Sequence, residues 1–187
     1  MTVGTPLTVR RLMAVDAAVR PGLVALVRDC VDGGASIGFM HPVDDAKAQA
    51  YWDGAAASLA RGDRALLVAE DAAGIAGSVQ LLLAMPENQP HRADLAKMMV
   101  HRRARRLGVG AALLQAAEAL AVELGRTLLV LDTGTPEAAR LYARHGWVAC
   151  GTVPGYALMP GGGPCDTTFY YRVLGPLPAA APGTAGP

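Results

Sequence analysis

Hydrophobic positions along the chain follow two spacings, one typical of strands and one typical of helices. Short apolar runs bounded by turn residues predict strands at 7–9, 65–70, 75–83, 94–100, 127–131, 147–153 and 166–173. Apolar residues three or four positions apart predict helices at 13–32, 44–61, 109–124 and 136–145, the first of them interrupted by Pro21. This order, β-α-α-β-β-β-α-β-α-β-β, predicts an α/β protein with a mixed sheet and helices on both faces.

Residues 95–124 combine a strand, a basic glycine-containing loop and a helix in one continuous stretch. Gly108 and Gly110 follow a run of arginines, so backbone N–H groups and a helix N-terminus are offered to phosphate. Leu113 stands where a dinucleotide-binding fingerprint has its third glycine, and no G-K-[ST] follows, which excludes both common nucleotide motifs. We therefore expect this loop to bind the diphosphate of a large cofactor.

Composition narrows the functional class. With 187 residues, 52% of them hydrophobic and 18% charged, the chain is predicted to form one domain over 1–174, followed by a disordered tail over 175–187. A net charge of +1 gives no reason to expect nucleic acid or a membrane as partner. The three cysteines are scattered and the four histidines lack ligand spacing, so we expect no disulfide framework, no metal and a cytoplasmic location.

The loop resembles the acetyl-CoA signature R/Q-x-x-G-x-G/A of the Gcn5-related N-acetyltransferases (GNAT), matched by Arg105, Gly108 and Gly110. The segment LYARHGW at 141–147 is similar to the last helix and following strand of that family, and the resemblance covers about 7–174. It implies a GNAT-like fold, with a central mixed, largely antiparallel sheet of about seven strands, and acetyl-CoA as co-substrate. The implied cofactor-binding residues are Met98, Met99, Val100, Arg105, Arg106, Leu107, Gly108, Val109, Gly110 and Ala111.

A narrower resemblance is to the tabtoxin-resistance acetyltransferases, carried by the segments 33–39, 90–100, 131–133 and 153–162. It implies that the acceptor is the amine of a small molecule, a β-lactam or amino-acid-like toxin or antibiotic. The loop departs from the family pattern at Arg102, Arg106 and Leu107.

The chemistry of amide formation selects the candidate catalytic residues. An alkylamine with a pKa of roughly 10 must lose a proton before it attacks a thioester. Asp94 is the first candidate for the base, and Asp132 could share that role or bind the ammonium group; each could instead simply cap a strand or a helix. Tyr142 matches the family's general acid, although a half-buried aromatic residue on a helix is the alternative.

The acceptor site is predicted to include Ser36 and Phe39 from the small, apolar loop 33–39, and Tyr156 from a later loop. Phe39 could instead belong to the core. Two other functions stay open, acetylation of a protein N-terminus or lysine, and a sensor that binds acyl-CoA without catalysis. The assembly is expected to be a monomer or homodimer.

Overall fold

One sheet of seven strands, in the order β1-β2-β3-β4-β5-β7-β6, organises the molecule. The computed structural model describes residues 7–176. Its elements are β1 (Thr8–Leu12), α1 (Arg20–Asp32), α2 (Asp45–Ala60), β2 (Arg64–Asp71), β3 (Gly74–Leu82), β4 (Arg92–Val100), the short 3-10 helix η1 (Arg102–Ala104), α3 (Val109–Glu123), β5 (Leu128–Thr133), α4 (Pro136–Arg144), β6 (Val148–Leu158) and β7 (Pro164–Val173). The predicted order and the mixed, largely antiparallel sheet are confirmed, since only β4 and β5 pair in parallel.

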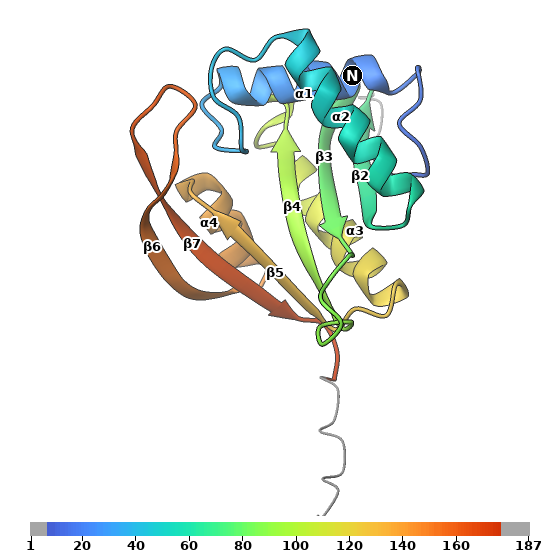
Figure 1. Cartoon of the computed structure of the whole chain (residues 1–187), viewed down its shortest axis with the longest axis vertical. Helices are drawn as coiled ribbons and strands as arrows, with labels where there is room; N and C mark the ends of the chain where they lie inside the picture. The colour runs from blue at the N-terminus through green and yellow to red at the C-terminus, as the bar shows by residue number, and fades with distance from the viewer. Residues whose placement is uncertain (1–6, 177–187) are drawn as a thin grey trace, which may run out of the picture.

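Helices cover both faces of the sheet (Figure 1). Leu23 of α1 and Trp52 of α2 belong to the core on one face of the sheet. Leu113 of α3 and Leu129 of β5 belong to a second core on the opposite face. Burial on both faces explains why β2 and β3 are almost continuously apolar. The predicted tail lies almost wholly outside the described residues.

Local sequence sets where the helices begin. The Asp44 carboxylate accepts a hydrogen bond from the Lys47 N–H, and the Thr135 hydroxyl accepts one from the Ala138 N–H. The first helix is shorter than predicted because it begins only at Arg20, with Pro21 in its first turn, where a missing N–H does no harm.

Strands β4 and β5 separate soon after they meet. They pair only at Arg92–Asp94 with Leu128–Val130, and beyond this point Figure 1 shows them diverging. A β-bulge interrupts the pairing of β4 with β3 between Ala96 and Met99, and Lys97 within it has a left-handed φ of 51°. From Leu95 onward, the edge of β4 that faces β5 therefore has no strand partner.

The last hairpin corrects one prediction. Tyr156 was expected in a loop, but β6 continues to Leu158 and places Tyr156 on a strand, with Phe169 of β7 as its neighbour. The tip of this hairpin reaches the loop between α1 and α2, where the His41 N–H donates to the Pro160 carbonyl at 2.9 Å. Two segments far apart in the chain thus meet on the α1–α2 face of the sheet.

Candidate active site

A cavity of about 260 Å³ lies where β4 and β5 separate. Its lining comes from β3, β4, β5, β6 and β7 and consists of Leu82, Arg92, Asp94, Leu95, Ala96, Val130, Leu131, Asp132, Tyr156 and Phe169. The rings of Tyr156 and Phe169 meet edge to face at 5.4 Å and form one wall. The structure therefore brings together three residues selected from the sequence, Asp94, Asp132 and Tyr156.

The register explains why both carboxylates enter the same cavity. Asp94 pairs with Val130, and Asp132 lies two residues further along β5, so both side chains point to the same face. Ala96, two residues beyond Asp94, is aligned with Gln80 and through it with Leu66, which belongs to the α1–α2 core. The carboxylates thus lie on the face that α1 and α2 cover only in part.

Asp94 is a half-buried carboxylate with an unusual electrostatic environment. Burial raises its pKa, the Arg92 guanidinium acts in the opposite direction, and the charge of Asp132 raises the pKa further. The Arg92 Nη1–H donates to Asp94 Oδ1 at 2.6 Å. A carboxyl group of raised pKa is a stronger base when ionised, which suits proton abstraction. Arg92 was not selected from the sequence, because nothing in the pattern shows that it orients Asp94.

Tyr142 is buried, with 3% of its surface exposed, and packs against Trp147 and Tyr170 at ring distances of 5.7 and 6.0 Å. Burial raises the pKa of its phenol well above the ordinary value, and the charge of Asp132 acts in the same direction. Its hydroxyl makes no hydrogen bond to another described residue. The ring therefore has the packing role considered as the alternative, and the hydroxyl stays protonated as an acid must.

Lys97, in the bulge of β4, was missed by sequence reasoning. Its side chain is half-buried on the α1–α2 face, with Nζ 6.0 Å from the centre of the Tyr51 ring. Burial lowers the pKa of this ammonium, the Asp132 carboxylate opposes that effect, and the Arg64 charge reinforces it. No sequence signal marks the position, because a β-bulge depends on pairing that the linear pattern does not show.

The basic loop divides into two parts. Arg102 holds Asp29 of α1 through its backbone N–H at 2.7 Å and its Nε–H at 2.9 Å, while Arg103 pairs with Asp71 and donates to the Ile75 carbonyl. Despite partial burial, the hydrogen bonds from Arg102 lower the pKa of Asp29. These two arginines fix the loop to the domain. In the described structure Arg105 donates its Nε–H to the Val100 carbonyl at 3.3 Å, but neither Arg105 nor Arg106 makes an ion pair, so their charges stay uncompensated by the described residues.

The N-terminus of α3 provides unsatisfied donors. Gly108, with a left-handed φ of 84°, precedes the helix and provides no side-chain cap. Within the described part of the chain, the N–H groups of residues 106–111 have no hydrogen-bond acceptor. Gly110 has a further role, because a Cβ there would lie 3.2 Å from Leu141 Cδ2 of α4. The predicted loop residues thus form a cradle of N–H groups suited to a diphosphate.

Other predicted residues lie outside the cavity. Ser36 and Phe39 do not line it, and Phe39 packs edge to face on Tyr51 at 5.3 Å beside the core, as its alternative interpretation held. Burial raises the pKa of the Cys30 thiol to about 11, which disfavours a nucleophilic role. Within residues 7–176 no three His, Cys, Asp or Glu side chains gather in a metal-binding group, and no helix there is long and apolar enough to cross a membrane.

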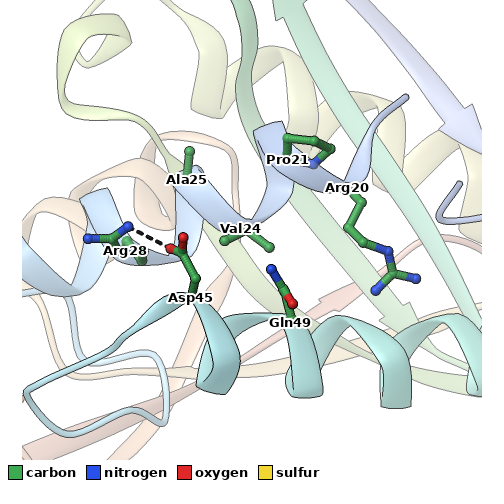
Figure 2. Close-up of a pocket in the computed structure, with 7 residues that line it drawn as sticks. All are labelled: Arg20, Pro21, Val24, Ala25, Arg28, Asp45 and Gln49. Atoms are coloured by element: carbon green, nitrogen blue, oxygen red, sulfur yellow. Dashed lines mark hydrogen bonds and ion pairs between the residues drawn. The ribbon is translucent and has the colours of Figure 1, made fainter. Parts of the chain in front are cut away.

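A second pocket, of about 280 Å³, lies between α1 and α2 and does not include the residues selected from the sequence. Figure 2 shows Arg28 of α1 turned toward Asp45 of α2, to which it is paired at 2.6 Å. Arg20 pairs with Asp53 at 2.5 Å. Because these charges are already compensated, this pocket is the weaker candidate for a site.

Comparisons with known proteins agree with this geometry. Residues 62–149 match the family described as the acetyltransferase (GNAT) domain. A candidate acetyltransferase from Salmonella typhimurium, solved with its cofactor acetyl-CoA, has the same fold with a TM-score of 0.73 at 21% identity, covering 96% of this chain and 99% of that chain. A candidate phosphinothricin N-acetyltransferase gives a TM-score of 0.73 at 24% identity, covering 91% of this chain and 100% of the other.

Ribosomal-protein-alanine N-acetyltransferase from Brucella melitensis gives a TM-score of 0.71 at 23% identity, with 89% of this chain and 99% of that chain covered. The family match extends from before β2 into β6 and so includes Asp94, the loop 105–111, Asp132 and Tyr142. The chain thus has the fold of solved GNAT acetyltransferases, and residues 62–149 match the domain of that family, which together support an N-acetyltransferase enzyme.

Proposed function

We propose that the protein transfers the acetyl group of acetyl-CoA to the amine of a small molecule, by direct attack of the amine on the thioester. The observation that carries the proposal is the pair of carboxylates, Asp94 and Asp132, in a cavity of about 260 Å³ beside the separated strands. A cavity of this size, just below the usual range of about 300–1,000 Å³ for ligand sites, suits a compact acceptor.

The chain offers a fitting place for the cofactor. The N–H groups of residues 106–111 would receive the diphosphate, with Arg105 and Arg106 adding positive charge. The open edge of β4 beyond Leu95 leads from there toward the carboxylates, and the pantetheine amides would pair with it as a strand does. The backbone of Met98, Met99 and Val100 would then lie beside the thioester, and an N–H at the bulge would stabilise the oxyanion.

Three side chains would bind the ammonium group and transfer the protons in this reaction. Asp94, whose pKa is raised by burial, would remove a proton from the ammonium, directly or through a water molecule. Asp132 would hold the ammonium before that step. Tyr142, buried and protonated, would supply a proton or a hydrogen bond to the departing thiolate.

The acceptor we propose is a β-lactam or amino-acid-like toxin or antibiotic, so that acetylation gives resistance. Two points support it, the similarity of four segments to the tabtoxin-resistance enzymes and the fold shared with a candidate phosphinothricin N-acetyltransferase. Acetylation of a protein N-terminus is the second candidate, favoured by the ribosomal-protein-alanine N-acetyltransferase among the similar structures.

An acetyl-transfer screen tests the proposal. Purified protein is incubated with acetyl-CoA and a panel of amino acids, amine-bearing antibiotics and short peptides, and the released thiol is measured. We expect acceptor-dependent thiol release with one small-molecule class. Turnover with peptides alone would favour the second candidate, and acetyl-CoA binding without thiol release from any acceptor would favour a sensor.

A further inference from the structure

A positively charged region adjoins the cavity on the same face of the sheet. Arg64 of β2 and Lys97 of β4 both lie against Tyr51 of α2. The Tyr51 hydroxyl donates to Gln80 Oε1 at 3.1 Å, and the Arg64 guanidinium donates to the same oxygen. We call Tyr51, Arg64, Gln80 and Lys97 the cationic subsite.

The cationic subsite has no acidic group of its own. In the described chain, Arg64 contacts the neutral Tyr51 and Gln80, and its Nε, like Gln80 Nε2, is buried without a partner. Gln80 is fully buried, so its unpaired amide N–H is costly unless a ligand or water binds it. Lys97 makes neither a hydrogen bond nor an ion pair to any residue from 7 to 176.

The fold places Lys97 here at an energetic cost. Its left-handed φ of 51° is unfavourable for a residue with a side chain, and its side chain is half-buried. The loop 33–39 passes directly over it, since a Cβ on Gly38 would lie 3.1 Å from Lys97 Nζ. A strained, half-buried cation next to a binding cavity, with an aromatic ring but no carboxylate as its described partner, is typical of a group kept for a ligand.

The charges around the cavity are therefore separated. Asp132 and Asp94, the latter paired with Arg92, lie at one end, and the cationic subsite lies beside them on the same sheet face. From this arrangement we propose that Lys97 binds an anionic group of the acceptor, a carboxylate or a similar oxyanion, while the carboxylates bind its amine. This rests on the proposed function and narrows the acceptor to amines that carry an acidic group.

Matched acceptors test the inference. Initial rates of thiol release are measured for amino acids as free acids and as the corresponding carboxamides, which keep the amine and lose the negative charge. We expect kcat/KM for the wild type to favour the acid about ten- to hundredfold, the range of one hydrogen bond to a charged group. The difference should lie mainly in KM.

Lys97→Met should reduce the acid-to-amide ratio to about 1, and Lys97→Arg should restore most of it. Lys47→Met is the matched control, because the side chain of this second lysine is exposed and, among the described residues, donates only to the Met40 carbonyl. Its ratio should equal that of the wild type. Acetyl-CoA binding, followed by thermal shift, shows that each variant is folded.

A second readout does not need turnover. Lysine labelling by acetic anhydride is followed by peptide mass spectrometry, and millimolar free acids should protect Lys97 but not Lys47, whereas carboxamides should protect neither. Equal rates for acids and amides, an unchanged ratio in Lys97→Met, or labelling of Lys97 that acids do not slow would overturn the inference. Absence of thiol release from every acceptor would instead count against the proposed function, and the protection result would still decide the role of Lys97.

Discussion

Replacing Arg106 by glycine separates the effect of its backbone conformation on stability from the effect of its charge on acetyl-CoA binding. Arg106 is exposed and adopts a left-handed φ of 64° at the start of the proposed diphosphate cradle. A side chain in this conformation costs about 1–2 kcal/mol. Glycine removes that strain but loses about 0.5–1 kcal/mol through the greater freedom of the unfolded chain. We therefore expect the free energy of unfolding to stay equal or rise slightly.

Binding of acetyl-CoA should respond in the opposite direction. Loss of one guanidinium–phosphate hydrogen bond costs about 1.5 kcal/mol, the low end for charged groups because the site is exposed, which corresponds to roughly a tenfold rise in Kd. Calorimetric titration with acetyl-CoA measures the Kd, and urea denaturation measures stability. The difference from the wild type should shrink at high salt.

Arg103→Ala is the matched control for this prediction. Arg103 already pairs with Asp71 and donates to the carbonyl oxygen of Ile75. Its loss should therefore lower the free energy of unfolding by about 1 kcal/mol and leave the Kd for acetyl-CoA unchanged. An unchanged Kd in Arg106→Gly, or a raised Kd in Arg103→Ala alone, would refute our division of the loop.

Three further substitutions test the site and its support. Asp94→Asn should lower kcat/KM by about 10²-fold or more. Because the base must be ionised, wild-type activity should fall as the pH drops through a pKa above the ordinary aspartate value. A pH–rate profile without this fall at low pH would contradict the role of Asp94 as base. Tyr142→Phe should lower kcat strongly with little change in stability or acetyl-CoA affinity, since the hydroxyl has no hydrogen bond within residues 7–176, and unchanged turnover would remove it from the acid role. Gly77→Ala should destabilise the fold by about 1–3 kcal/mol in urea denaturation, because the new Cβ would meet the Met99 carbonyl oxygen at 2.7 Å and Leu113 Cδ1 at 2.9 Å; wild-type stability would contradict the packing described for β3, β4 and α3.

Local signals in the sequence were sufficient to predict the order of helices and strands. The caps at Asp44 and Thr135, and the apolar stripe of α3 that includes Leu113, depend on neighbours a few residues away. The start of the last loop was predicted wrongly because β6 and β7 continue to pair as far as Leu158 and Pro164. The register shift between Val153 and Ala157, which contains Pro154 and Gly155, breaks the alternation that would have marked this part of the strand.

The candidate site shows the same limit. Asp132 could be selected because it ends a buried strand, where ligands bind in α/β sheets, and Asp94 because amide formation needs a base and the family resemblance implies a carboxylate at that position; both line the cavity. Arg92 and Lys97 were missed because one acts through an ion pair and the other through a β-bulge. The arginines of the loop look alike in sequence, and only their partners, Asp29 and Asp71, distinguish those that fix the loop.

Hydrogen–deuterium exchange with and without acetyl-CoA tests the central claim, that the cofactor lies between the α3 N-terminus and the open edge of β4. We predict slower exchange for the N–H groups of residues 106–111 and for those of residues 98–100 at the end of β4, with no change in the pocket between α1 and α2. Protection confined to the pocket between α1 and α2, or no protection at 106–111 and 98–100 while acetyl-CoA is bound, would contradict this placement of the cofactor.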